Sequence, residues 1–124
     1  MGAVPHGDIV FLDEIEKDIV KWSGRMVRVL AVLESYDPQE NRASIELEGY
    51  RLAVDTSLLG VFSYHLNSLY QWIGELHVNN NKATHEESLI LHARIMSNSD
   101  GLDIQLYRKA VQLRREYYNK KEND

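Results

Sequence analysis

The stretch at residues 68–76, Ser-Leu-Tyr-Gln-Trp-Ile-Gly-Glu-Leu, constrains the fold more than any other part of the chain. In an extended backbone, one side of it carries Tyr70, Trp72, Gly74 and Leu76, and the other side is also partly apolar. Aromatic and branched side chains favour a strand, and a glycine inside a strand predicts a bend, a bulge or a close backbone approach. Such a stretch is typical of the wall of a small closed barrel.

Three alternating stretches precede it, at residues 24–37, 42–48 and 50–55. The first is long and apolar on both sides, so it must be well covered, or be bent and shared between two parts of a sheet. Turn residues at 37–41 and a glycine at position 49 separate the three stretches. The pattern predicts an antiparallel meander.

The alternation is lost at residues 56–66, where we expect a short helix capped by Thr56 or Ser57. The rest of the barrel is expected as a strand at 68–78, a polar loop at 79–87 and a fifth strand at 89–96.

From residue 102 the apolar spacing becomes helical. The stripe is wide and contains Leu102, Ile104, Leu106, Tyr107, Ala110, Val111, Leu113 and Tyr117. Asp100 is the expected N-cap, and Asp103 would favour the positive end of the helix. One side of a small barrel cannot cover so broad a stripe, so we expect part of it to meet another chain; packing within this chain alone is the alternative.

Three strands, a short helix, two strands and a final helix form the order of an OB-fold, a five-stranded β-barrel, here with a C-terminal α-helix. The expected class is therefore all-β with flanking helices, in one domain. Residues 1–23 would be an extension that packs on the barrel, either as a short helix or as a loop that plugs one end. Residues 24–100 would form the barrel, and residues 101–124 the partner-binding helix.

The net charge of −5 is unevenly distributed: residues 8–21 are mostly acidic and residues 103–121 mostly basic. An acidic protein is a poor stand-alone trap for phosphates, although a basic tail can add contacts within an assembly. No apolar run is long enough to cross a membrane, so we expect no membrane partner. The absence of cysteine excludes disulfides and suits an intracellular protein.

Catalytic motifs are missing, and we expect neither enzymatic activity nor a cofactor. His77, His85 and His92 lie on the two strands around the predicted hairpin and the loop between them, but without supporting cysteines they are a weak zinc signal, and we expect no metal. Tyr70 and Trp72 are read as core and rim residues of the barrel rather than a ligand slot, with Gly74 as its bend.

Single-stranded nucleic acid is the usual ligand of such barrels, bound on the second and third strands. Here that face has no aromatic platform and carries several acidic side chains, so we expect weak binding at most. Better candidates for an auxiliary contact are Arg25 and Arg28, together with the aromatic and basic end of the helix, where Tyr117 and Lys121 lie.

Residues 68–76, together with Ala93-Arg94-Ile95, Asp100-Gly101-Leu102-Asp103 and Leu106-Tyr107, resemble the TEN subunit family of the CST complex, most closely its plant-type members. CST is a telomere-capping trimer of CTC, STN and TEN subunits. The resemblance covers roughly residues 24–118 in the expected order. It implies a single OB-fold that pairs with the STN subunit through packing of the final helices.

On this sequence the resemblance assigns partner binding to the final helix, at Leu102, Leu106, Tyr107, Ala110, Val111, Leu113 and Tyr117. It implies weaker contacts with a partner subunit or DNA at Arg28, Tyr117 and Lys121. The whole complex, with CTC, would bind G-rich single-stranded DNA in the nucleus at chromosome ends and assist DNA polymerase alpha-primase in C-strand fill-in. The alternatives are the smallest subunit of a replication protein A-like complex, a stand-alone DNA-binding module, or a chaperone-like protein.

Overall fold

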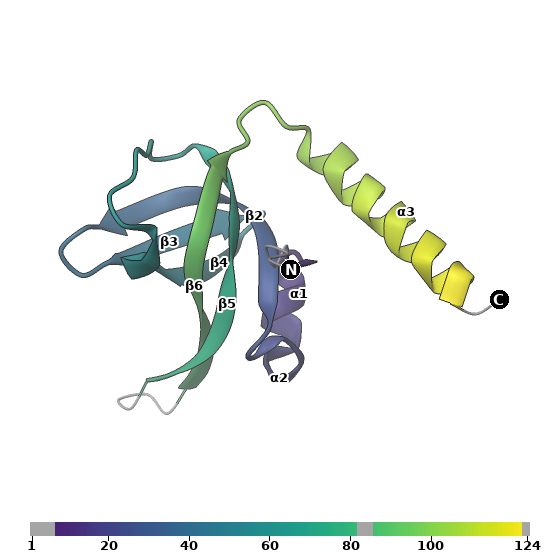
Figure 1. The fold of residues 1–124 in the computed structure, drawn as a ribbon, viewed down its shortest axis with the longest axis horizontal. Coiled ribbons are helices and arrows are strands. Elements are labelled where there is room, and N and C mark those ends of the chain that lie inside the picture. The colour runs from purple at the N-terminus through teal and green to yellow at the C-terminus, as the bar shows by residue number, and fades with distance from the viewer. Residues whose placement is uncertain (1–6, 82–85, 123–124) are drawn as a thin grey trace, which may run out of the picture.

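The computed structural model describes residues 7–81 and 86–122 of the 124-residue chain. Its elements follow one another as β1 (Asp8–Ile9), α1 (Leu12–Lys17), α2 (Ile19–Trp22), β2 (Met26–Asp37), β3 (Arg42–Leu47), β4 (Tyr50–Asp55), the 3-10 turn η1 (Ser57–Leu59), β5 (Leu69–Asn81), β6 (Glu86–Asn98) and α3 (Ile104–Glu122). Figure 1 shows the strands curled around one another, with α1 and α2 beside β2, and α3 running away from the strands after β6.

The barrel closes because β2 pairs with two neighbours. Its first half, residues 26–32, runs antiparallel to β5, and its second half, residues 32–37, runs antiparallel to β3. The pairs β3–β4 and β5–β6 are antiparallel, whereas β4 and β6 are parallel. The result is a closed five-stranded barrel with a C-terminal helix, so the predicted fold is confirmed. Of the two forms expected for its long first strand, the structure has the one shared between two parts of the sheet. β1 adds a short parallel strand to β2.

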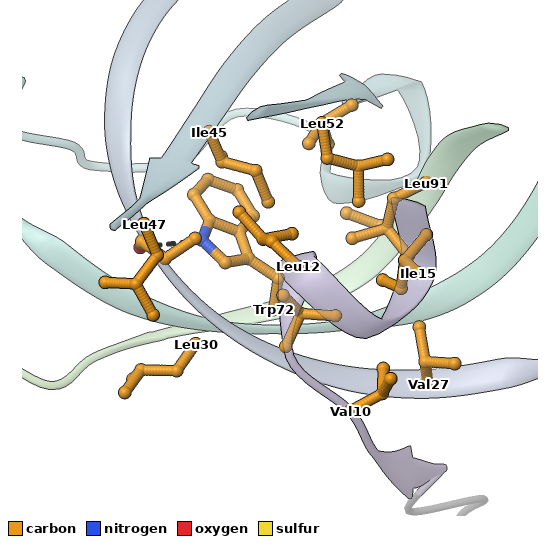
Figure 2. Packing of buried hydrophobic residues seen from close by; sticks show 14 of the residues in the cluster. Val10, Leu12, Ile15, Val27, Leu30, Ile45, Leu47, Leu52, Trp72 and Leu91 are labelled. Carbon is orange, nitrogen blue, oxygen red and sulfur yellow. Dashed lines mark hydrogen bonds between the residues drawn. The ribbon is translucent and has the colours of Figure 1, made fainter. Parts of the chain in front are cut away.

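The alternation of apolar residues fills the barrel interior as the sequence pattern predicts. On β3, Ala43, Ile45 and Leu47 are buried, and the residues between them are not. Trp72 of β5 has no exposed surface, and its indole N–H donates a hydrogen bond of 3.2 Å to the carbonyl oxygen of Ala31. Figure 2 shows this bond within the surrounding cluster of aliphatic side chains.

The segment before β2 forms part of the same core. Leu12 and Ile15 of α1 are each 3% exposed, and both belong to the hydrophobic cluster that contains Trp72 (Figure 2). Their spacing of three residues places both side chains on one face of the helix. The N-terminal part of the chain is therefore anchored in the barrel by a short helix, the first of the two forms that we expected.

The polar loop expected at residues 79–87 is largely strand instead. β5 continues to Asn81 and β6 begins at Glu86, and the two remain paired along this extension, for example Asn79 with Ser88. Pairing between the two backbones satisfies their hydrogen-bonding groups and requires no apolar side chains. The polar sequence therefore did not predict this extension of the strands. Residues 82–85 lie outside the described part of the chain.

Two other expectations are corrected at the helices. The segment at 56–66 contains only the single turn η1, whose N-cap Thr56 makes no side-chain capping bond. α3 starts at Ile104 and is capped by Asp103, whose carboxylate accepts a hydrogen bond of 3.0 Å from the N–H of Leu106. The carboxylate of Asp100, the expected cap, instead accepts a bond of 2.8 Å from the N–H of Leu69 at the start of β5.

Candidate functional site

α3 has two different long sides. The side toward the rest of the chain carries Ile104, Tyr107, Arg108, Val111 and Arg115, and the opposite side, which we call the outward face, carries Leu106, Ala110, Leu113 and Tyr117. On the outward face, Leu106 is 64%, Leu113 58% and Tyr117 63% exposed. Large apolar side chains in such an arrangement along a helix form a continuous surface, which the described part of this chain leaves uncovered.

This division narrows the predicted partner-binding set. Val111 is only 6% exposed, and Tyr107 is half-buried and packed against the core cluster. Both side chains therefore contact this chain, although the resemblance assigned them to partner binding. Leu102 lies just before α3 and is 41% exposed, so it remains available together with the outward face.

The buried side of α3 rests on residues that the sequence reasoning did not single out. Arg108 donates hydrogen bonds of 3.0 Å to both Asp13 and Glu48, and its guanidinium lies 4.0 Å from the ring centre of Phe11. Partial burial by itself would lower the pKa of Arg108, but the bonds to the two carboxylates outweigh it and raise the pKa. This arginine therefore stays charged where it contacts the aromatic ring.

A second attachment lies two turns further along α3. Arg115 donates hydrogen bonds of 2.8 and 3.1 Å to Glu14 and one of 2.7 Å to the carbonyl oxygen of Ile9. We call the residues that receive these contacts, Ile9, Phe11, Asp13 and Glu14, the N-terminal clamp. The opposite charges of residues 8–21 and 103–121 were the available signal for this contact.

An open groove of about 900 Å³ lies between α2, the start of β2 and the second half of α3. Among the residues that the structure describes, its walls carry five cations, which are Lys21, Arg25, Arg28, Arg114 and Arg115, and we call it the basic groove. Trp22 and Tyr118 line it as well, with Arg25 located 5.4 Å from the Trp22 ring centre and Arg114 located 5.5 Å from that of Tyr118.

The acidic side chains of the groove are both engaged. Asp8 lies 3.8 Å from the guanidinium of Arg25, and Glu14 is bonded to Arg115. Five cations against two carboxylates leave the groove positive, although the chain as a whole is acidic. The structure thus brings together Arg25 and Arg28 with Tyr118, whereas Tyr117 lies on the outward face. Lys121 belongs to the last turn of α3, and its side chain lies outside the described part of the structure.

The outer surface of β3 and β4, the usual ligand face of this fold, has a different character. Glu34 accepts hydrogen bonds from Ser44 at 3.1 Å and from the Nε of Arg51 at 3.0 Å. The side chain of Arg51 is thus held by a neighbouring carboxylate, while Ala53 supplies no ring on which a base could stack. The basic groove is therefore a better candidate for binding anions than the outer surface of β3 and β4.

The stretch at residues 68–76 lies in the barrel wall. Tyr70 and Trp72 are buried, with ring centres 5.7 Å apart. The pairing of β5 with β6 shifts register between Ile73 and Gly74, and a Cβ at Gly74 would lie 2.8 Å from the carbonyl carbon of His92. These residues shape the barrel and line neither the basic groove nor the outward face.

The histidines do not form a metal centre in the part of the chain that the structure describes. The rings of His77 and His92 lie 4.5 Å apart, while His85 falls outside the described residues. Within those residues, no group of three or more His, Asp or Glu side chains is arranged to hold a metal ion. No described helix combines the length and apolar character needed to span a bilayer.

Comparison of the fold with solved structures finds the same architecture in other proteins. The crystal structure of the Stn1–Ten1 complex of S. pombe gives a TM-score of 0.70 at 14% identity, and covers 92% of this chain and 96% of the matched chain. The telomere capping protein Ten1 from Saccharomyces pombe gives 0.67 at 16% identity, covering 87% and 96%. The hypothetical protein ygiW of E. coli gives 0.58 at 10% identity, covering 80% and 100%. At these identities the likeness concerns the fold.

Comparison of the sequence is more specific. The chain is 37% identical over 102 residues to the CST complex subunit TEN1 of Arabidopsis thaliana, which covers 81% of this chain and 76% of that protein. The family described as "Telomere-capping, CST complex subunit" matches residues 3–121, nearly the whole length. The resemblance noted from residues 68–76 and the shorter motifs is thereby confirmed, and the chain belongs to this family of telomere-capping CST complex subunits.

Proposed function

We propose that this chain is a non-enzymatic adaptor that pairs with the STN subunit through the outward face of α3, and that it acts in the nucleus at telomeres. The observation that carries the proposal is the exposure of Leu106, Leu113 and Tyr117 on the side of α3 opposite the barrel. The similarity of the fold to the S. pombe Stn1–Ten1 complex supports a partner of this kind. Contact with CTC, and assistance to DNA polymerase alpha-primase, would then come through the assembled complex.

The physical argument is the cost of leaving this face in water. Burial of a leucine side chain contributes roughly 1.5–3 kcal/mol, and Leu106 and Leu113 lie on the same side of α3, with Ala110 between them. The small side chain of Ala110 permits close approach by a partner helix. An amphipathic helix packed along this face is the occupant that such spacing favours.

Replacing both Leu106 and Leu113 by aspartate is expected to abolish binding to the STN subunit, because two charges would enter the apolar contact. The melting temperature should hardly change, since both side chains are exposed. The measurement is co-purification and titration calorimetry with the STN subunit. A matched control is Gln105→Asp with Gln112→Asp, which has the same spacing on an exposed side of α3 away from the outward face.

Undiminished pairing of the Leu106→Asp, Leu113→Asp variant would contradict the proposal, as would an equal loss in the glutamine control. The identity of the captured subunit separates CST from a replication protein A-like assembly. A chaperone-like role for the outward face makes a different prediction, namely that the isolated chain suppresses aggregation of unfolded client proteins.

The basic groove supports a second, auxiliary role, in which it contacts the DNA strand within the assembled complex. Tyr118 is 50% exposed, so its ring is accessible beside Arg114, whereas Trp22 is only 7% exposed and lies beneath Lys21 and Arg25. An accessible ring among cations suits a single strand better than the β3–β4 surface does. The net charge of −5 predicts that the chain alone binds DNA weakly.

Replacing Arg25 and Arg114 by glutamine is expected to weaken G-rich single-strand binding by the complex, and to reduce the slope of log affinity against log salt by about 1.4, or about 0.7 for each cation. Fluorescence anisotropy at several salt concentrations measures both quantities. Lys17→Gln with Arg42→Gln removes two exposed cations outside the groove and serves as the control. Equal salt slopes for the two variants would exclude the groove, and tight DNA binding by the isolated chain would contradict the adaptor role.

A further inference from the structure

α3 is attached to the barrel mainly through side chains of one of its faces. Figure 1 shows it directed away from the strands after β6, so the short linker at residues 99–103 alone would leave it free to swing. Most of its side-chain contacts are with the segment before β2. Tyr107 meets the ring of Phe11 edge-on, with ring centres 6.0 Å apart, and Val111 on the same side of α3 is buried.

Two polar attachment points fix this contact. Arg108 is bonded to Asp13 and Glu48, and Arg115 is bonded to Glu14 and the carbonyl oxygen of Ile9. The two arginines are seven positions apart, which corresponds to about 10 Å along a helix axis and almost two whole turns. Two points at this separation on the same side of a helix determine both its direction and its rotation about its own axis.

The N-terminal clamp is itself rigidly connected to the barrel. Phe11 is 1% exposed, and Leu12 and Ile15 are buried in the barrel core. Glu14 has two functions, because its carboxylate accepts a hydrogen bond of 3.0 Å from the N–H of Phe11 and also receives Arg115. The orientation of α1 is therefore transmitted to α3 through side chains that are anchored in the core.

We infer that the N-terminal clamp positions α3 for its partner, so that residues that never touch the STN subunit determine how well it binds. This inference rests on the proposed pairing through the outward face. Because the clamp holds the buried side of α3, it also sets the direction in which Leu106 and Leu113 point. A binding surface that is already oriented loses less conformational freedom on association, and so binds more tightly than the same surface on a swinging helix.

The first part of the test measures the orientation of α3 directly. The chain contains no cysteine, so spin labels can be attached to cysteines introduced at Glu40, in the turn after β2, and at Glu116, on an exposed side of α3. Pulsed electron paramagnetic resonance should give one narrow distance distribution for the otherwise unchanged chain. Asp13→Asn with Glu14→Gln should broaden it. Arg108→Gln with Arg115→Gln should broaden it too, because it removes the same ion pairs from the other element, together with the bonds to Glu48 and to the carbonyl oxygen of Ile9.

The second part measures STN affinity in the same variants without labels. Both clamp variants are expected to bind about tenfold more weakly, with circular dichroism showing an intact barrel. Arg94→Gln with Glu75→Gln removes a surface ion pair between β5 and β6, outside both the clamp and α3, and should leave both distance and affinity unchanged. Both clamp variants should lose affinity. The Asp13→Asn, Glu14→Gln variant is the stricter test, because these residues lie on α1 and their replacement changes no residue of α3, which carries the outward face.

A narrow distribution in both clamp variants would overturn the inference, and so would a broadened distribution with unchanged affinity. The Leu106→Asp, Leu113→Asp variant separates this failure from failure of the proposed function. It should keep the narrow distribution while losing the partner. If it still bound the STN subunit, the proposed pairing face would be wrong, whatever the clamp variants showed.

Discussion

Replacing Gly74 by alanine is expected to lower the free energy of unfolding by about 3 kcal/mol, at the upper end for overpacking, and the melting temperature by roughly 10 °C. The added Cβ would lie 2.8 Å from the carbonyl carbon of His92 and 2.9 Å from the Cα of Ala93, and both of these are backbone atoms of the paired strand. Backbone in a closed barrel cannot move aside as a flexible side chain can. Thermal and urea unfolding measure the effect, and Gly74→Glu should be still more damaging.

Gly101→Ala is the informative comparison for Gly74. Gly101 has a φ of +88°, and nothing lies within 4 Å of a Cβ placed there, so its cost is backbone strain of about 1–2 kcal/mol. If Gly74→Ala were no more destabilising than Gly101→Ala, the register shift beside Gly74 would have to absorb the extra carbon. The close approach of β5 and β6 would then not be the reason for a glycine in this strand.

The barrel was predictable because its signals are local. The alternation at residues 42–48 and 50–55 fixes which side chains point inward, and Gly74 interrupts an apolar strand where the register shifts. The extension of the β5–β6 hairpin was not predicted, because its residues carry no such local signal. Asn79 and Ser88 carry no apolar signal, and their strand conformation comes from pairing with each other.

The site was predictable only in part, because its contacts are not local. Arg108 and its partner Asp13 are 95 positions apart in the sequence, and Arg115 and Glu14 are 101 positions apart. A charge run is usually a solvated face, so the opposite charges of the two segments did not by themselves imply a contact. The helical period likewise identified a wide apolar stripe, but it could not separate Val111, which packs on this chain, from Leu113, which does not.

Replacing Trp72 by alanine is expected to cost about 3–5 kcal/mol for the lost packing of a large aromatic side chain. Loss of the indole N–H adds about 1–3 kcal/mol if the carbonyl oxygen of Ala31 remains without a donor. Domains of this size are stabilised by only about 5–15 kcal/mol. A large fraction of the Trp72→Ala chains should therefore be unfolded at physiological temperature, as chemical denaturation followed by circular dichroism will measure.

Trp72→Phe serves as the matched control, because it keeps an aromatic ring in the core and removes the hydrogen bond to Ala31. It should lie between the wild type and Trp72→Ala in stability. Both variants should lose STN binding only in proportion to the fraction unfolded, in contrast to Leu106→Asp with Leu113→Asp, which should lose binding while folded. If folded Trp72→Phe bound STN far more weakly than its folded fraction predicts, the barrel interior would also be contributing to the orientation of α3, through α1 and the clamp.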